Sequence, residues 1–235
     1  MTAVCASTAS AAGAPRSSTA AVLFDLDGTL VDSAPDLAGA TNELRVAQGL
    51  EPLPFGQLRP VVGSGARGLL AVALGVAPGD PRFDALRDDL LGRYEQRLLR
   101  ETRVFEQMDP VLRRLDERGV PWGIVTNKVA RFAVPVVTGL QLRERCAVLI
   151  SGDTLPYTKP HPAPLLAAAQ TLGLPAARCV YVGDDRRDVL AGRAAGMPTL
   201  AAAWGYLGND ESPHAWSSDA VLDAPAELLH WLGLA

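Results

Sequence analysis

The stretch AAVLFDLDGT, residues 20–29, decides the fold that this sequence predicts. Its first five residues form a short, continuous apolar run, and that run ends at an acidic turn that contains a glycine. A continuous apolar run suits a strand that is buried on both faces, as the strands of a parallel sheet are. We therefore expect a buried strand over 20–24 that carries Asp25 and Asp27 at its carboxyl end.

Downstream of residue 104, apolar runs alternate with helical patterns. Strands are predicted at 120–125, 147–150, 179–182 and 198–203, and helices at 130–140, 162–172 and 186–195. A further helix is predicted to have Asp109 as its N-cap, Pro110 at its first position and Gly119 as its end. Strands that alternate with helices imply an α/β fold whose core is a Rossmann-like parallel sheet with right-handed crossovers.

Residues 33–103 break this alternation. They are helical in pattern over 37–48, 69–74 and 83–99, and they contain no convincing strand. We expect an α/β core domain of 20–32 and 104–235, with 33–103 inserted as a helical cap subdomain. Because ligands of open parallel sheets bind outside the carboxyl ends of the strands, the cap would lie over the site as a lid.

Composition and charge argue against several classes of protein. The formal net charge is −4 and there is no basic run, which argues against nucleic-acid binding. No apolar run approaches the ~18 residues of a membrane span. Residues 1–19 lack the features of a secretory signal and are predicted to be a disordered tail. Cys5, Cys146 and Cys179 are odd in number and far apart, which fits reduced thiols in the cytoplasm. The oligomeric state, monomer or homodimer, stays open.

Polar residues that can support chemistry fall at the ends of the predicted strands. Because parallel strands end at one edge of a sheet, these residues should meet. They are Asp25–Thr29 after the first strand, Thr126-Asn127-Lys128 after the second, Lys159 ahead of a helix, and Gly183–Asp188 after the strand at 179–182.

Together these groups suit phosphoryl transfer. Carboxylates and a backbone carbonyl form a hard oxygen site of the kind that Mg²⁺ takes. A carboxylate that attacks a phosphate dianion at ~3.5 Å faces roughly 9 kcal/mol of repulsion at an effective dielectric of 20. Mg²⁺ and the Lys159 ammonium would reverse that sign, and Thr126 and Asn127 can donate hydrogen bonds to the phosphoryl oxygens.

With all four motifs in order, the chain resembles the haloacid dehalogenase-like (HAD) phosphohydrolases from about residue 20 onward. The resemblance implies that Asp25 is a nucleophile that becomes an aspartyl-phosphate, and that Asp27 is the general acid and then the general base. It implies Asp25, the Asp27 carbonyl and Asp184 as Mg²⁺ ligands. Asp188 would orient metal-bound waters or Lys159 from outside that ligand set, and Asp185 has at most a similar outer role. The predicted substrate contacts are Gly28, Thr126, Asn127 and Lys159, and Arg67 in the cap is a candidate contact.

Asp27 favours ester hydrolysis among the reactions of this family. Dehalogenase members lack this second carboxylate, whereas a phosphatase must protonate a poor leaving group. The mutase branch typically carries a Lys and a Ser-Arg pattern in its cap, and the stretch 62–68 here reads VGSGARG. A phosphatase that acts on a small-molecule phosphate ester is therefore expected.

Three other classes compete with this interpretation. GSGARG at 63–68 matches a dinucleotide fingerprint, but only two apolar residues precede it, which disfavours an NAD-dependent oxidoreductase. The segment fits a flexible cap loop, in which Arg67 either contacts the substrate anion or forms a surface salt bridge. A glycosyltransferase explains Asp-x-Asp but not Lys159, and a binding-only protein would have lost a catalytic group. Lys128 and Arg131 either face the mouth of the site or are solvated charges at a helix start, and the second alternative is predicted.

Shorter patterns bear on the substrate. The loop 62–65 with Leu69-Leu70, together with 126–128, resembles the phosphoglycolate phosphatase branch. The stretches 125–128, 131–133, 204–206 and 214–216 resemble phosphatases of N-acetylmuramic acid 6-phosphate. The expected substrate is 2-phosphoglycolate, with the amino-sugar phosphate as the alternative.

Overall fold

The computed structural model describes residues 19–207 and 212–235. Its centre is a six-stranded sheet of order β5-β4-β1-β6-β7-β8 in which every pairing is parallel. The strands are β1 Ala21–Phe24, β4 Trp122–Val125, β5 Val148–Ile150, β6 Cys179–Gly183, β7 Thr199–Ala202 and β8 Ala220–Leu222. The predicted α/β fold is confirmed. The tail predicted for 1–19 lies, apart from Thr19, outside the described residues.

Strand β1 lies in the middle of the sheet because its side chains are apolar on both faces. All four of its residues are buried, and β4 and β6 pair with it on either side. Val22 and Phe24 face one core cluster, and Ala21 and Leu23 face the other. The continuous apolar run therefore predicted a strand that is buried on both faces, and the structure places this strand inside the sheet between β4 and β6.

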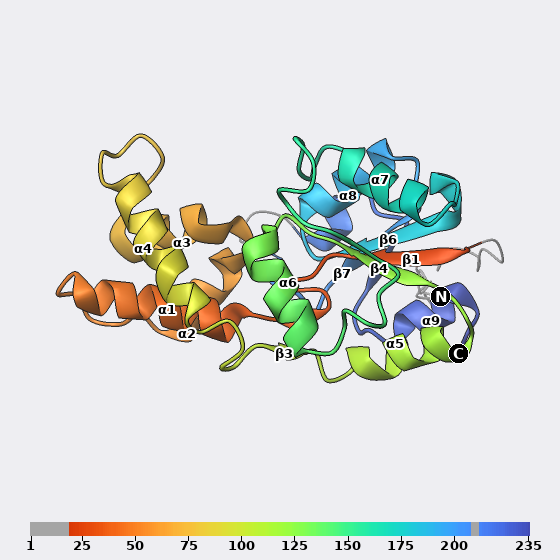
Figure 1. Ribbon diagram of the computed structural model, residues 1–235, viewed down its shortest axis with the longest axis horizontal. Helices are drawn as coiled ribbons and strands as arrows, with labels where there is room; N and C mark the ends of the chain where they lie inside the picture. The colour runs from red at the N-terminus through yellow and green to blue at the C-terminus, as the bar shows by residue number, and fades with distance from the viewer. Residues whose placement is uncertain (1–18, 208–211) are drawn as a thin grey trace, which may run out of the picture.

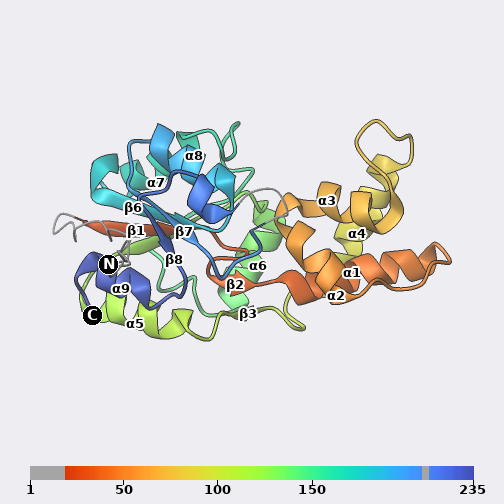
Figure 2. The same cartoon turned by 180° about the vertical axis from the view of Figure 1, so that it is seen from behind.

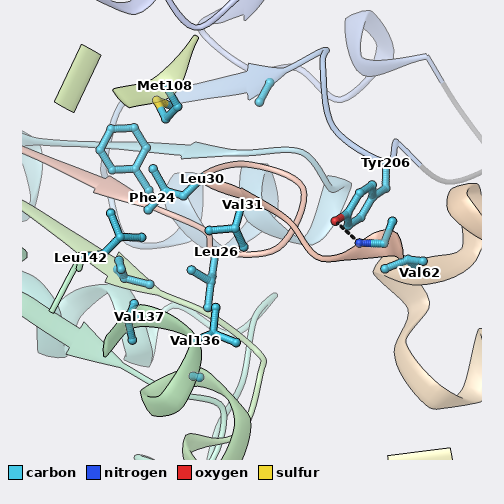
Figure 3. Close-up of a cluster of buried hydrophobic side chains, with 14 of the residues drawn as sticks. Phe24, Leu26, Leu30, Val31, Val62, Met108, Val136, Val137, Leu142 and Tyr206 are labelled. Atoms are coloured by element: carbon cyan, nitrogen blue, oxygen red, sulfur yellow. Dashed lines mark hydrogen bonds between the residues drawn. The ribbon is translucent and has the colours of Figure 1, made fainter. Parts of the chain in front are cut away.

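Helices cover both faces of this sheet (Figure 1). On one face lie α5 Met108–Glu117, α6 Ala130–Gly139 and α9 Glu227–Leu232, and on the other lie α7 Ala163–Thr171 and α8 Arg186–Ala194. Figure 3 shows Phe24, Met108 and Val136 with Leu26 and Leu30 in the core cluster on the face of the sheet that α5, α6 and α9 cover. The core thus extends to the turn that follows β1, which anchors the backbone that carries Asp25 and Asp27.

Four helices lie together at one end of the molecule (Figures 1 and 2). Along the chain they are flanked by two very short strands. The helices are α1 Ala34–Ala47, α2 Phe55–Leu58, α3 Gly65–Leu74 and α4 Phe83–Glu95, with a 3-10 helix at Arg59–Ser64. β2 Val31–Asp32 and β3 Arg103–Val104 pair antiparallel at the base of this group. The buried Asp36 accepts the Thr102 N–H at 2.8 Å and so fixes the returning chain. The division into core and cap domains stays a prediction.

Several local predictions need correction. Asp109 is not an N-cap: α5 begins at Met108, Gln107 precedes it, and no side chain caps the helix. α4 ends at Glu95 rather than near residue 99. The pair β2–β3, the last strand β8 and helix α9 were not predicted, because elements of two to six residues show too few periods to be recognised. Within the described residues, no helix is both long and apolar enough to span a bilayer.

Candidate active site

A cavity of about 380 Å³ opens where β1, β4 and β6 end and the helical group begins. The predicted site residues that line it are Asp25, Asp27, Thr126, Asn127, Lys159, Asp184, Asp185 and Asp188. The four separated motifs therefore meet in one place, as their positions after parallel strands predicted. Gly28 and Arg67 are not among the lining residues.

Lys159 is held between two carboxylates. Its Nζ lies 2.9 Å from Asp25 Oδ1 and 2.7 Å from Asp188 Oδ1, and its side chain is only 2% exposed. Burial alone would lower the pKa of Lys159, but the charges of Asp188 and Asp25 outweigh burial and raise it. Lys159 also donates to the Tyr181 hydroxyl at 2.7 Å, and that hydroxyl donates to the Val125 carbonyl at 2.8 Å. The ammonium is thus charged and fixed beside Asp25.

Asp25, Asp184 and Asp188 form a cluster of carboxylates. One oxygen from each lies within 4.8 Å of the others. Burial, followed by the charges of Asp25 and Asp188, raises the pKa of Asp184 well above its usual range. Burial likewise raises the pKa of Asp188 to about 6, although Lys159 opposes that shift. Crowded, desolvated carboxylates with this spacing fit a hard divalent cation.

The turn after β1 is shaped around Asp184. Gly28 has a φ of +82°, and a Cβ there would lie 2.2 Å from Asp184 Oδ2. A Cβ on Gly205 would lie 2.1 Å from the Cβ of Asp184. Thr29 Oγ1 donates to Asp184 Oδ1 at 2.9 Å, and the Tyr206 N–H donates to Oδ2 at 2.8 Å. Gly28 therefore makes room for a proposed ligand instead of lining the cavity itself.

We expect Gly28→Ala to lower kcat by about 10²-fold, because the new methyl group displaces Asp184 by an ångström or more. The left-handed backbone adds roughly 1–2 kcal/mol of destabilisation. Gly49→Ala is the matched control: its φ is +76°, and no atom lies within 4 Å of the added Cβ. Thermal unfolding and initial rates separate the two effects. Equal activity of both variants would contradict the role of Gly28 in making room for the Asp184 side chain.

The Asp27 carboxylate is not part of the acidic cluster and has other partners. Lys128 Nζ lies 2.9 and 3.1 Å from its two oxygens, and Ser33 Oγ donates to Oδ1. Lys128 also donates to the Tyr94 hydroxyl of α4 at 2.6 Å, and its side chain is 7% exposed. The prediction that Lys128 is a solvated charge is wrong. The scarcity of lysine in the sequence could have marked Lys128 as a site residue, because Lys128 and Lys159 are its only two lysines.

Thr126 and Asn127 arrange the loops around the cavity. The Asn127 side chain donates from Nδ2 to the Lys159 carbonyl and accepts the Lys159 N–H at Oδ1, both at 2.9 Å. Thr126 Oγ1 accepts the Lys128 N–H at 3.2 Å. Asn127 therefore positions the Lys159 loop, and direct contacts of Thr126 and Asn127 with substrate stay predictions.

Asp185 and Arg187 link α8 to the helical group. Asp185 caps α8 by accepting the Arg187 N–H at 2.8 Å, and the Asp185 N–H donates back to Asp188 at 3.0 Å. Arg187, which the sequence did not single out, donates to the Gly63 carbonyl at 2.6 Å. Arg67 is exposed outside the cavity, so its contact with a substrate anion stays a prediction. Gly63 lies in the 3-10 helix Arg59–Ser64 and does not follow directly on a strand, so the dinucleotide fingerprint lacks its structural context.

Comparison with known families agrees with this geometry. The model of the haloacid dehalogenase-like hydrolase family matches residues 22–202, which include all four motifs. The chain belongs to this family. The predicted family membership is thereby confirmed, and the acidic cluster fits the divalent metal that HAD phosphatases use.

Individual HAD proteins are similar over most of the chain. A phosphoglycolate phosphatase of Xanthomonas campestris is 49% identical over 208 residues, which cover 88% of this chain and 94% of the relative. An N-acetylmuramic acid 6-phosphate phosphatase of Pseudomonas aeruginosa is 40% identical over 92% of this chain and 95% of the relative. A crystal structure described as a predicted phosphoglycolate phosphatase from Haemophilus somnus superimposes with a TM-score of 0.80 at 26% identity, over 91% of this chain and 97% of its own.

Proposed function

We propose that this HAD hydrolase is a Mg²⁺-dependent phosphatase that cleaves a small phosphate monoester through an aspartyl-phosphate on Asp25. The observation that carries the proposal is the placement of Asp25 beside a buried lysine and next to two further carboxylates, with Asp27 held separately. Such a site can neutralise a phosphoryl group and still offer it a nucleophile. The cytoplasmic location stays a prediction from the sequence.

In the first half-reaction Asp25 attacks phosphorus and the ester oxygen leaves. Within the described residues, both recorded contacts of the Asp25 carboxylate use Oδ1, from the Leu26 N–H and from Lys159. That leaves Oδ2 to form the new O–P bond. Lys159 offsets the charge that the two anions bring together, and Asp27 delivers its proton to the leaving oxygen.

In the second half-reaction water hydrolyses the aspartyl-phosphate. Asp27, now ionised, accepts a proton from the water, whose oxygen attacks phosphorus as the bond to Asp25 Oδ2 breaks. Asp25, Asp184 and the Asp27 carbonyl would hold Mg²⁺, which supplies further neutralisation of phosphoryl oxygens. Ser33 and Lys128 keep the Asp27 carboxylate oriented through both steps.

Removal of divalent metal should stop turnover. With excess EDTA we expect the rate to fall to background, because the crowded carboxylates then repel the phosphate dianion. Added Mg²⁺ should restore the rate, and the measurement is a phosphate-release assay before and after chelation. Turnover that persists in EDTA would contradict the proposed site.

The best-supported substrate is 2-phosphoglycolate, on the strength of the 49% identical relative. N-acetylmuramic acid 6-phosphate is the second candidate, because a 40% identical relative is named for it and a cavity of about 380 Å³ is of ordinary size for a ligand larger than a two-carbon acid. Both candidates carry a carboxylate on the leaving group. Initial rates on a panel of both compounds and common sugar phosphates test the assignment, and failure of all of them would contradict it.

A further inference from the structure

Beside Asp27 the cavity holds a second buried cation, to which the proposed phosphoryl chemistry gives no task except to orient the Asp27 carboxylate. Lys128 lines the cavity and lies against Asp27, whereas Lys159 occupies the acidic cluster around Asp25. The remaining lining cation among the described residues, Arg187, is paired with Asp185 and the Gly63 carbonyl. Lys128 is therefore the positive charge on the side where a leaving group would extend.

Lys128 is not needed merely to fix Asp27. Ser33 Oγ already donates to Asp27 Oδ1, and the Asp27 backbone bridges to Val31. The side chain of Lys128 is only 7% exposed and lines the cavity. A buried ammonium in this position would stabilise a substrate anion.

Tyr94 supplies a second donor at the same place. Its hydroxyl accepts a hydrogen bond from Lys128 at 2.6 Å, and its ring lies 4.8 Å from Nζ. Burial raises the pKa of Tyr94, although the charge of Lys128 opposes that shift, so the hydroxyl keeps its proton at neutral pH. No acceptor for this proton is recorded among the described residues, and Tyr94 lines the cavity.

The surrounding wall strengthens an ionic contact here. Leu37, Leu91, Val129 and Phe132 also line the cavity, none of them offers a polar side-chain atom, and the Phe132 ring lies 5.4 Å from that of Tyr94. An ion pair in such a setting is screened less than one in water. A flat anion with two oxygens can accept from an ammonium and a phenol side by side, as a carboxylate does.

We propose that Lys128 and Tyr94 bind a carboxylate on the leaving group, so that the enzyme selects phosphate monoesters that carry this second anion. The inference rests on the proposed function and names the feature that its two candidate substrates share. Lys128 comes from the loop after β4 and Tyr94 from α4, so the subsite forms only where the helical group meets the sheet.

Matched pairs of esters test this subsite. One pair is 2-phosphoglycolate and 2-hydroxyethyl phosphate, and the other is N-acetylmuramic acid 6-phosphate and N-acetylglucosamine 6-phosphate, which lacks the carboxylate. The quantity measured is the ratio of kcat/KM for the acid to kcat/KM for its neutral partner. We expect at least one pair to give a wild-type ratio of tenfold or more, since a hydrogen bond to a charged group is worth about that factor.

Two variants then locate the selectivity. Tyr94→Phe should lower the wild-type ratio by about tenfold, mainly through KM for the acid, and Lys128→Met should lower it further. Tyr157→Phe is the matched control, because this tyrosine is 55% exposed and stacks on His161 outside the cavity. Its ratio should equal that of the wild type.

Each other outcome has a definite meaning. If both variants lose activity equally on acid and neutral esters, Lys128 and Tyr94 act only through Asp27 and the subsite is refuted. If the wild type cleaves neutral esters as well as acids, the subsite alone is refuted and the phosphatase stands. If the wild type cleaves none of the four esters, the proposed substrates fail and this inference fails with them.

Discussion

Asp25→Asn is expected to abolish phosphate release. The amide is nearly isosteric with the carboxylate, and its oxygen can replace Oδ1 as the acceptor for Leu26 and Lys159. The nitrogen that takes the place of Oδ2 has no free electron pair with which to attack phosphorus. We expect kcat to fall by at least about 10³-fold, in line with the loss of other covalent nucleophiles.

The assay needs a control for folding and one for contamination by other phosphatases. Asp223→Asn changes an exposed acid far along the chain from the motifs and should behave as wild type. A cooperative thermal unfolding transition of Asp25→Asn shows that the variant is folded, and the amide oxygen can keep both contacts of Oδ1. The nucleophile assignment fails if the variant retains kcat within about tenfold of wild type.

The sequence predicted the sheet well because its strands are buried on both faces. AVLF at 21–24 and VYVG at 180–183 carry no charged side chain and no polar–apolar alternation that would mark an exposed face, and a parallel pairing follows from that. The position of Asp25 followed from the same logic, because the ends of parallel strands meet at one edge of the sheet, whereas Lys159 reaches the site from the loop between β5 and α7.

The contacts of individual side chains were harder to predict. The surroundings of Lys128 depend on Tyr94, which lies in another element and meets it only in the folded chain. The Asn127 amide pairs with the backbone of Lys159, a partner that no local pattern reveals, and its contact with substrate stays a prediction. Sequence patterns report which face an element buries, and not which polar groups meet across it.

Asp184→Asn should raise the stability of the metal-free protein and lower its phosphatase activity. Burial and the neighbouring Asp25 and Asp188 raise the pKa of Asp184, so its ionised form is disfavoured in the folded, metal-free protein. A group with a raised folded pKa contributes stability that is present below its unfolded value, near 3.8, and is lost as pH rises through the folded value. Asparagine stays neutral and avoids that loss.

Without metal at neutral pH we therefore expect the variant to unfold at a higher temperature than wild type. The gain is roughly 2–4 °C for each kcal/mol of repulsion removed in a chain of this length. The packing can be kept, because Oδ1 of the asparagine can accept the Tyr206 N–H while its amide donates to Thr29 Oγ1. The difference between the two proteins should shrink as pH is lowered toward 4.

Mg²⁺ should reverse the order of stability. Ligand that binds only the folded state raises Tm, so wild type should gain stability with added Mg²⁺ while Asp184→Asn, which lacks one proposed ligand, gains little. Phosphate release by the variant should fall by at least about 10²-fold over the same titration. Charge crowding in the metal-free site and its relief by a cation have the same origin. A metal-free variant less stable than wild type, or one that Mg²⁺ stabilises as much as wild type, would therefore show that the cluster of Asp25, Asp184 and Asp188 is not a cation site.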